Sequence, residues 1–330
     1  MASPITLALD WTLNTNHSGF VVAKAKNYYT DEGLDVSLIS PGSDYKPPAD
    51  LVRTGSATFG ITPSETVISS LTRSPQLKAI ATLLEEDTSA IVTLKSSGID
   101  APSKLDGKIY ASYAARYEGR IVQEIIRADG GKGDFREATP SVMGIWDTLL
   151  KGEADATWIF LGWEGVDAQI KGVELNAFKL GDYGIPYGYT PLLVALPQFL
   201  RDYPDVARAF LRATSRGFQY TAEHPAEAAQ YLLAAAPDSM DKKLALASQQ
   251  MVSKHYLDAG GRWGHMRAER WDKFLDWLGD KGLLTSAMPS RNPVDGVSAS
   301  LDDLRSGRAG EPHPRSSINA ADLYTNEFLP

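Results

Sequence analysis

Residues 7–36 read LALDWTLNTNHSGFVVAKAKNYYTDEGLDV. This stretch holds a short apolar strand ending at Leu9, a polar loop, and a helix over Phe20–Tyr29 whose apolar residues recur on one face. Gly33 predicts the end of that helix, and Val36 opens a second apolar strand. A strand, a helix and a strand in this order predict a βαβ unit with parallel strands.

The same alternation continues along most of the chain. Short apolar runs between turn residues predict strands at Ile5–Leu9, Val36–Ile39, Thr58–Ile61, Leu77–Leu83, Ile91–Leu94, Lys108–Ala111, Ala156–Phe160 and Leu192–Leu196. Helical periodicity predicts helices over Tyr117–Ala128, Ser141–Lys151, Tyr203–Ala222, Pro225–Ala235, Asp241–Tyr256 and Ala268–Leu278. Gly282–Pro314 is rich in Gly, Pro, Ser and Arg and predicts an extended tail. The chain is therefore expected to be an α/β protein with mostly parallel sheets.

Composition narrows the class of function. The 330 residues allow two domains, and 33 Lys and Arg against 41 Asp and Glu leave a net charge of −8. An acidic chain without a basic block is not expected to bind nucleic acid, which requires cations for its phosphates. Because the chain has no cysteine, disulfides, thiolate metal sites and cysteine nucleophiles are excluded.

The N-terminal residues and the longest uncharged stretch bear on the cellular location of the protein. Met1–Asp10 has no basic segment and only a short apolar run, so we expect a cytoplasmic protein, or a periplasmic or extracytoplasmic one if a signal was trimmed. The longest uncharged stretch, Tyr183–Leu200, is interrupted by prolines and glycines and does not predict a membrane helix.

Motifs for common cofactors are missing from the sequence. It contains no Walker A loop, no dinucleotide fingerprint, no nucleophile elbow and no zinc-binding H-E-x-x-H. Its five histidines are not paired at metal-ligand spacing. We therefore expect no metal, no cofactor and no catalytic residues.

Several stretches together carry a resemblance to a known family. The opening stretch is joined by GSATFGITPSETVISS (55–70), ADATWIFLGWEGVDAQIKGVELN (154–176), DYGIPYGYTPLL (182–193) and YTNEFLP (324–330). Together they resemble the thiamine-pyrimidine branch of the SsuA-like family. That branch includes bacterial formylaminopyrimidine-binding receptors and fungal hydroxymethylpyrimidine phosphate synthases.

The resemblance implies a type II periplasmic-binding-protein fold, in which two α/β lobes are joined by two crossover strands. The strands at Ile91–Leu94 and Leu192–Leu196 are the expected crossovers. Residues 1–88 and 197–330 would then form lobe 1, and residues 89–196 lobe 2. A ligand would bind in the cleft between the lobes, which close by hinge motion.

A pyrimidine has two flat apolar faces and a polar edge, so its site needs aromatic walls and polar groups aimed at the edge. Loops after the carboxyl ends of strands are the expected place for them. The candidates are Asp10, Trp11, Asn14, Asn16, His17, Trp163, Glu164, Tyr187 and Tyr189. For the aromatic residues the alternative is a core position, as expected for Trp158. Glu164 is alternatively a helix N-terminal acid, and His17 is alternatively a residue that organises its loop.

The stretch Ser112–Arg120 reads SYAARYEGR and predicts a turn from a strand into a helix. A helix N-terminus beside Arg116 forms a candidate anion site, flanked by Tyr113 and Tyr117. The alternative is a solvated surface arginine. Family members that handle phosphorylated pyrimidine have a similarly placed turn, but its glycine content differs here.

Ser64 and Glu65 bear on the choice between a binder and an enzyme. At this turn the synthases of the family carry a lysine that holds pyridoxal phosphate and a histidine that is consumed. Residues 60–72 contain neither lysine nor histidine, and the cysteine cluster of the synthases is also missing. Ser64 and Glu65 are therefore expected to contact a ligand, with an N-cap role as the alternative for Ser64.

Three functions remain open at this stage. The first is a non-catalytic receptor for a thiamine-related pyrimidine, partnered by an ABC transporter permease if the protein is exported. The second is an enzyme of pyrimidine synthesis or salvage, favoured by the missing signal peptide. The third keeps the receptor fold but takes another small aromatic or sulfonate ligand.

Overall fold

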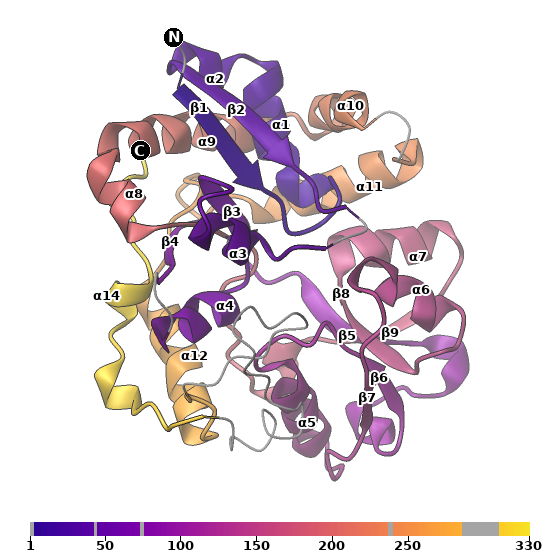
Figure 1. Ribbon diagram of the computed structural model, residues 1–330. Helices are drawn as coiled ribbons and strands as arrows, with labels where there is room; N and C mark the ends of the chain where they lie inside the picture. The colour runs from indigo at the N-terminus through magenta and orange to yellow at the C-terminus, as the bar shows by residue number, and fades with distance from the viewer. Residues whose placement is uncertain (1–2, 43–44, 73–75, 237–239, 286–309) are drawn as a thin grey trace. The chain divides into compact units, whose positions relative to one another are not determined.

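The computed structural model describes residues 3–42, 45–72, 76–236, 240–285 and 310–330 (Figure 1). These residues contain two five-stranded sheets. The first sheet holds β1 (Ser3–Ala8), β2 (Leu34–Ile39), β3 (Phe59–Thr62), β4 (Lys78–Thr82) and β10 (Leu192–Ala195). The second holds β5 (Ser89–Leu94), β6 (Ile109–Ala111), β7 (Arg136–Ala138), β8 (Ala156–Phe160) and β9 (Leu175–Phe178).

The two sheets share one plan. Their strand orders are β2-β1-β3-β10-β4 and β7-β6-β8-β5-β9. In the first sheet β10 is antiparallel to both neighbours, and in the second β5 is antiparallel to both. The remaining pairs are parallel. In each sheet four strands therefore run in one direction and one strand runs against them, so the sheets are mixed but mostly parallel, as expected. The sequence did not reveal the reversed strand, because a buried apolar run does not show the direction of its strand.

The helices cover a wide range of lengths. They are α1 (Ser18–Ala25), α2 (Tyr28–Asp31), α3 (Pro48–Arg53), α4 (Ser64–Ser69), α5 (Glu118–Ala128), α6 (Ile145–Leu150), α7 (Val166–Ile170), α8 (Pro197–Asp202), α9 (Pro204–Glu223), α10 (Pro225–Ala235), α11 (Lys242–Val252), α12 (Ala268–Asp280) and α14 (Ala320–Leu323). In the described part of the chain, no helix combines the length and the apolar character needed to cross a bilayer.

The chain divides into two compact units. Unit 1 comprises Met1–Asp87, Tyr189–Ala268 and Ala320–Pro330, and unit 2 comprises Thr88–Gly188 and Glu269–Asn319. The units begin near the two expected crossovers, since β5 follows Thr88 directly and β10 lies shortly after Tyr189.

Two boundaries differ from those expected from the sequence. The sequence placed 189–196 in lobe 2 and 269–319 in lobe 1, whereas the contacts place β10 in unit 1 and most of α12 in unit 2. Phe274 of α12 explains the second difference, because its ring packs against Tyr117 and Tyr187 of unit 2. An amphipathic pattern predicts that α12 buries one face, but not which unit receives it.

Two short strands were not predicted from the sequence, and one predicted segment lies mostly outside the described residues. β7 and β9 were not predicted, because the sequences REA and LNAF are too short to give a strand pattern. Most of the predicted tail Gly282–Pro314 lies outside the described residues.

The core of unit 1 is built around the crossing of α1 and α9, which lie beside β1 and β2 in Figure 1. Phe20 and Phe218 meet edge to face at 5.2 Å, and Phe218 stacks on Trp263 at 4.6 Å. The helices approach closely because both contribute a glycine. A Cβ atom on Gly217 would lie 2.1 Å from the carbonyl oxygen of Gly19.

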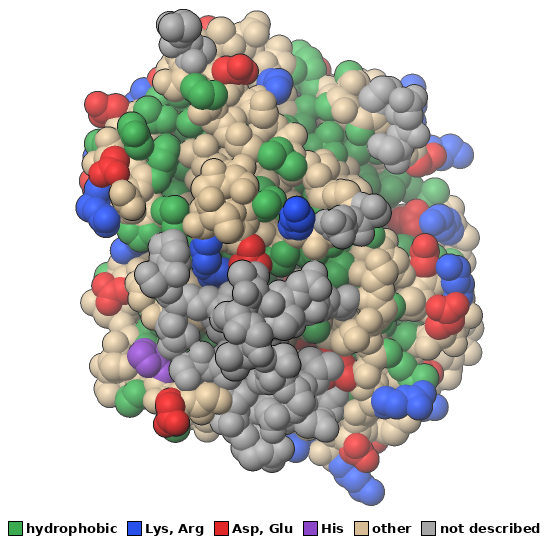
Figure 2. Space-filling model, in the orientation of Figure 1, with side chains coloured by type: hydrophobic (Ala, Val, Ile, Leu, Met, Phe, Trp, Pro, Cys, Tyr) green, Lys and Arg blue, Asp and Glu red, His purple; other side chains and the backbone are tan. Residues whose placement is uncertain are grey.

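The charged side chains lie mainly on the surface. On the face drawn in Figure 2, Lys and Arg side chains are interspersed with Asp and Glu side chains. Several pair with a residue four positions away, as in Lys171–Asp167 at 2.7 Å and Lys104–Asp100 at 2.7 Å. Exposed pairs of this kind contribute little to stability.

The close helix crossing gives a first prediction. Gly217→Ala forces a methyl group against the backbone of Gly19, so we expect unfolding to require about 3 kcal/mol less than in the native protein. Gly181→Ala is the matched control, because its Cβ would meet nothing within 4 Å. Urea titration followed by circular dichroism measures both variants, and equal stabilities would contradict the role of the crossing.

Candidate functional site

The predicted site residues of unit 1 gather at one edge of its sheet. Because β1 and β3 are parallel, the loops that follow them emerge at the same edge. β10 is antiparallel to β3, so the residues preceding it lie there too. The backbone N–H of Ser64 donates to the carbonyl of Tyr189 at 2.9 Å and ties two of these segments together.

The loop after β1 is organised by His17, whose side chain is fully buried. Its Nδ1 accepts the backbone N–H of Asn14 at 3.2 Å, so the neutral ring carries its proton on Nε2. Nε2 then donates to Oδ1 of Asp10 at 2.8 Å. Both ring nitrogens are engaged inside the loop, which favours the organising role for His17 over direct ligand contact.

A buried polar network fastens the same loop to the helix α11. Thr15 Oγ1 lies 2.6 Å from Ser248 Oγ, and Ser18 Oγ donates to Gln249 Oε1 at 2.5 Å. The hydroxyl of Tyr256 donates to the carbonyl of Thr15 at 2.5 Å. Sequence reasoning missed the three anchoring residues. Ser248 and Gln249 lie on α11, Tyr256 lies beyond its end at Val252, and no local pattern marks these residues as anchors of a distant loop.

The two asparagines of the loop have different roles. Asn14 is used by the backbone, because its Oδ1 accepts the N–H of Asn16 at 2.9 Å and its Nδ2 donates to the carbonyl of Thr12 at 3.0 Å. Asn16 is only 6% exposed, and its side-chain amide has no hydrogen-bond partner among the residues that the structure describes. Trp11, at the start of the loop, is half-buried.

Ser64 and Glu65 begin α4, directly after β3. Ser64 is the first helical residue and Pro63 is the N-cap, so the alternative N-cap role for Ser64 is wrong. The hydroxyl of Ser64 is fully buried and has no hydrogen-bond partner within the described part of the chain. Glu65 is buried in the first turn, where the helix dipole favours an acid.

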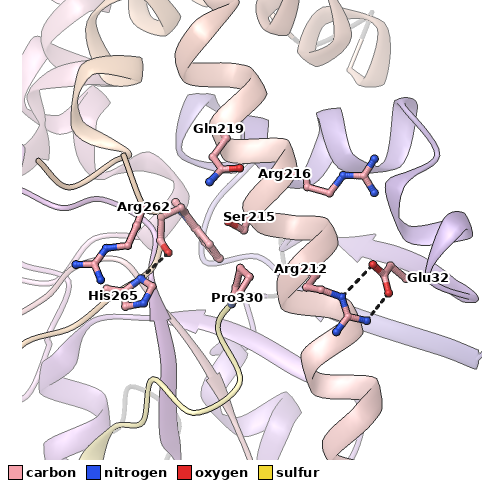
Figure 3. A pocket seen from close by; sticks show the side chains of 9 residues that line it. Glu32, Arg212, Ser215, Arg216, Gln219, Arg262, His265 and Pro330 are labelled. Carbon is pink, nitrogen blue, oxygen red and sulfur yellow. Dashed lines mark hydrogen bonds and ion pairs between the residues drawn. The ribbon is translucent and has the colours of Figure 1, made fainter. Parts of the chain in front are cut away.

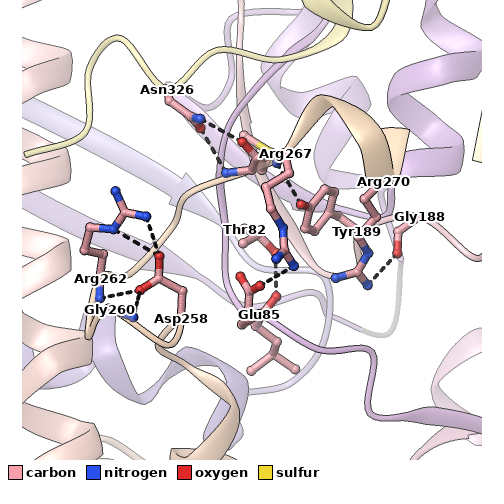
Figure 4. A network of polar contacts seen from close by, with 12 residues as sticks. Thr82, Glu85, Gly188, Tyr189, Asp258, Gly260, Arg262, Arg267, Arg270 and Asn326 are labelled. Carbon is pink, nitrogen blue, oxygen red and sulfur yellow. Dashed lines mark hydrogen bonds and ion pairs between the residues drawn. The ribbon is translucent and has the colours of Figure 1, made fainter. Parts of the chain in front are cut away.

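Tyr189 belongs to a network of hydrogen bonds and an ion pair within unit 1 (Figure 4). The ring of Tyr189 is fully buried, and its hydroxyl accepts the backbone N–H of Arg267 at 2.9 Å. The Arg267 guanidinium pairs with Glu85 at 2.6 Å, and Asn326 makes two hydrogen bonds to the backbone of Met266. The loop before α12 is thus fixed to three other segments of unit 1, those that contain Glu85, Tyr189 and Asn326.

In unit 2 the turn after β6 is held by a residue that sequence reasoning missed. Glu118, the first residue of α5, is 2% exposed. Its carboxylate accepts the hydroxyls of Tyr110 at 2.8 Å and Ser112 at 3.0 Å, and the backbone N–H groups of Tyr113 at 3.1 Å and Ala115 at 3.0 Å. Burial raises the pKa of this carboxyl to about 7, with a smaller contribution from Glu137.

The arginine of this turn is buried, not solvated. Arg116 is 5% exposed, so the alternative of a surface arginine is wrong. Its Nη2 donates to the carbonyl of Leu283 at 3.3 Å and to Thr285 Oγ1 at 2.5 Å. Its guanidinium lies 5.0 Å from the ring of Tyr117, which is itself buried. Tyr113 is half-buried beside them.

The loop after β8 presents Trp163 and Glu164 on a single π-helical turn, Leu161–Gly165. Such turns often occur at functional sites. The half-buried indole of Trp163 has no hydrogen bond or ring contact with the described residues. Glu164 is buried, and its Oε2 accepts the N–H of Phe160 at 3.1 Å, so it has the helix-start contact weighed as its alternative role.

An aromatic cluster lies in the same unit. The ring of Tyr187 is 5.2 Å from that of Trp158 and 5.3 Å from that of Phe274. Trp158 is buried, as expected for a core residue. The cluster shows why Tyr187 is only partly exposed, since its ring is sandwiched by unit 2 itself.

Unit 1 also contains a cavity of about 320 Å³ that no predicted site residue lines (Figure 3). Figure 3 shows Ser215 and Gln219 on α9 facing His265 and Pro330. The arginines around it have partners: Arg212 forms two bonds with Glu32 at 3.1 and 2.5 Å, and Arg262 pairs with Asp258 at 2.8 Å. Among the described residues, no group of three or more metal-ligating side chains occurs.

Solved structures identify the class of protein to which this fold belongs. A protein of Bordetella bronchiseptica RB50 superposes with a TM-score of 0.70 at 17% identity, covering 99% of this chain and 95% of that one. The periplasmic aliphatic sulphonate-binding protein of Escherichia coli gives a TM-score of 0.63 at 13% identity, with 86% and 94% covered. The fold is that of periplasmic binding proteins, as predicted.

The chain belongs to the family described as NMT1/THI5 like, whose model matches residues 14–228. One relative is a 4-amino-5-hydroxymethyl-2-methylpyrimidine phosphate synthase of Legionella pneumophila, 25% identical over 72% of this chain and 75% of its own. Another is a formylaminopyrimidine-binding protein of Halalkalibacterium halodurans, 22% identical over 83% and 84%. The resemblance found in the sequence is confirmed.

The buried carboxyl of Glu118 gives a prediction about pH. Its pKa is about 7 in the folded protein and lies near the ordinary 4.5 in the unfolded chain, so the folded state binds the proton more tightly. Its contribution to stability is complete below pH 4.5 and is lost as the pH rises through 7. The loss amounts to about 3 kcal/mol at about 1.4 kcal/mol per pKa unit.

Urea unfolding of the native protein and Glu118→Gln between pH 4.5 and 8 measures this contribution. The stability difference between the two proteins is expected to change across the interval. Glu124→Gln is the control: burial raises the pKa of Glu124, but the ion pairs with Lys281 and Arg120 outweigh it and hold that pKa low. The difference in free energy of unfolding between Glu124→Gln and the native protein should not change over this pH range. If the difference for Glu118→Gln does not change either, the raised pKa of Glu118 is contradicted.

Proposed function

We propose that this protein is a non-catalytic receptor for a small thiamine-related pyrimidine, of the hydroxymethyl or formylaminomethyl type, and serves uptake or salvage of thiamine precursors. The observation that carries the proposal is a pair of buried polar groups at the carboxyl edge of the unit 1 sheet. The Ser64 hydroxyl is fully buried and lacks a partner among the described residues. The side-chain amide of Asn16, a residue that is 6% exposed, also makes no hydrogen bond with them.

Unpartnered buried groups of this kind indicate a ligand. A buried amide or hydroxyl without a hydrogen bond is costly, and native proteins rarely keep one without a reason. An asparagine amide supplies one acceptor and two donors, and a serine hydroxyl supplies either. This set matches the edge of an aminopyrimidine, where an amino donor stands beside a ring-nitrogen acceptor.

The family supports a pyrimidine ligand and leaves a choice between binding and synthesis. Among the relatives, one name states formylaminopyrimidine binding and another states synthesis of a pyrimidine phosphate. The turn between β3 and α4 favours binding, because residues 60–72 offer no amine for a Schiff base and no histidine. Ser64 and Glu65 stand at the start of that helix instead.

The remaining candidate contacts are proposed on the same grounds. Trp163 offers an indole face without a ring partner in its own unit, which suits stacking on a flat ring. Asp10, Trp11, Tyr113, Glu164, Tyr187 and Tyr189 follow or precede strands at the edges of their own sheets. A permease of an ABC transporter is the proposed partner, with an extracytoplasmic location for the receptor.

A thermal-unfolding screen tests the ligand. The panel contains hydroxymethylpyrimidine, its phosphate, the formylamino analogue, thiamine, pyridoxal phosphate and an alkanesulfonate. A ligand at 100 times its dissociation constant adds about 2.7 kcal/mol, which raises the melting temperature by a few degrees in a chain of this size. We expect a shift with a pyrimidine. A shift with pyridoxal phosphate alone would support the enzyme hypothesis. A shift with the alkanesulfonate alone would show that the ligand is a sulfonate and not a pyrimidine.

Two asparagine variants separate recognition from loop stability. Asn16→Ala removes an amide that makes no hydrogen bond with the described residues, so we expect nearly unchanged stability and at least about tenfold weaker pyrimidine binding, equal to about 1.4 kcal/mol. Asn14→Ala removes a cap and should lower stability by about 1 kcal/mol. Calorimetric titration and urea unfolding provide the two readouts. Native affinity in Asn16→Ala would refute the assigned contact.

A further inference from the structure

One face of α9 forms a wall of the cavity of about 320 Å³ in unit 1 (Figure 3). Arg212, Ser215, Arg216 and Gln219 stand at i, i+3, i+4 and i+7, the spacing that places side chains on one side of a helix. Every residue that lines the cavity belongs to unit 1, and none of them is a candidate contact for the pyrimidine. The cavity is therefore a separate feature of this unit.

Two polar side chains on this face of α9 have unused hydrogen-bonding groups. Ser215 is 2% exposed, yet its hydroxyl makes no hydrogen bond with the described residues. The half-buried amide of Gln219 makes none with them either. Both side chains line the cavity and face His265 and Pro330 in Figure 3. Because a buried hydroxyl without a partner is costly, these groups indicate that a ligand binds in the cavity.

The charged side chains of the lining carry an excess of cations. Three arginines and one glutamate line the cavity. The glutamate, Glu32, accepts two hydrogen bonds from Arg212, at 3.1 and 2.5 Å. Arg262 pairs at 2.8 Å with Asp258, which lies outside the lining. These two pairs leave Arg216 as the third cation of the lining.

Arg216 keeps its hydrogen-bond donors for a ligand. Its guanidinium lies over the ring of Tyr28, 4.0 Å from the ring centre, and its Nη1 is 4.0 Å from Oδ2 of Asp31. Arg216 makes no hydrogen bond with the described residues, and an exposed ion pair of this length holds it only weakly. A guanidinium can donate two parallel hydrogen bonds to one carboxylate, so Arg216 suits a carboxylate ligand.

We propose that this cavity is a second ligand site, which takes a small organic carboxylate. Arg216 supplies the positive charge, and Ser215 and Gln219 supply further donors. The cavity volume lies at the lower end of the range for small-molecule sites and exceeds what an inorganic anion needs. Trp263 and Pro330 contribute apolar rings to the lining, against which the body of the ligand packs.

Thermal unfolding with millimolar citrate, glutamate or benzoate tests the site, with sodium chloride of equal ionic strength as the reference. At least one carboxylate should raise the melting temperature of the native protein by about 2 °C or more. Arg216→Gln should lose most of this shift. Arg208→Gln is the matched control and should keep it, because Arg208 lies on the same helix and does not line the cavity.

Three results would overturn the inference. The first is that no carboxylate stabilises the native protein more than chloride does. The second is that inorganic phosphate stabilises it as much as the carboxylates do, which would show a general effect of anions. The third is that Arg216→Gln and Arg208→Gln lose the shift equally, which would show an effect of net charge.

Ser215→Ala tests the buried hydroxyl. Because the change removes a group without a partner among the described residues, the melting temperature without ligand should not fall. Calorimetric titration with the most stabilising carboxylate should show affinity several-fold weaker than in the native protein, and equal affinity would overturn the inference.

Pyrimidine titration separates this inference from the proposed function. The native protein and Arg216→Gln should bind pyrimidine equally, and a loss in the variant would overturn the assignment of a separate site. If a carboxylate binds but no pyrimidine does, the proposed function fails while the second site stands.

Discussion

The crossing of α1 and α9 at Gly19 and Gly217 is the contact on which unit 1 depends. Because neither glycine has a side chain, the backbones meet closely enough for Phe20 and Phe218 to interlock beside the crossing. α1 begins at Ser18, immediately after the loop that carries Asn14 and Asn16. The packing of α1 against α9 therefore also sets the position of this loop. Helix packing and the candidate site are thus parts of one arrangement.

Both units use a buried ionisable side chain to hold a turn at the sheet edge. In unit 1 the imidazole of His17 accepts a backbone N–H and donates to Asp10. In unit 2 the carboxylate of Glu118 accepts two backbone N–H groups and two hydroxyls. Backbone N–H groups of a turn that is shielded from water require hydrogen-bond acceptors. In both units the acceptor is a side chain at the start of the helix that follows the turn. The groups on Asn16 and Ser64, which have no such partners among the described residues, are the ones proposed as ligand contacts.

The sequence pattern located most elements, and its errors have physical causes. Pro225–Ala235 matches α10 to the residue, because a proline starts it and apolar periodicity continues through it. Phe20–Tyr29 was expected as one helix, but Asn27 adopts a left-handed φ of 60° and separates α1 from α2. The loops named from the sequence stay a prediction as the candidate site. Ser248 and Gln249, which anchor one of these loops, and Glu118, which holds another, were missed because a polar residue type alone does not show which backbone group it will bind.

The sequence alone determined the alternation of strands and helices, the family, and the chemistry that is missing, namely any cysteine and any lysine or histidine in residues 60–72. Residue types and short-range periodicity are sufficient for these conclusions, because they depend on neighbours along the chain. The tertiary structure decided strand direction, the unit that α12 joins, and the partners of Arg116 and Glu118. These features depend on which buried surfaces pack together. The sequence of an apolar face or the type of a polar side chain does not show which distant residue it will contact in the folded chain.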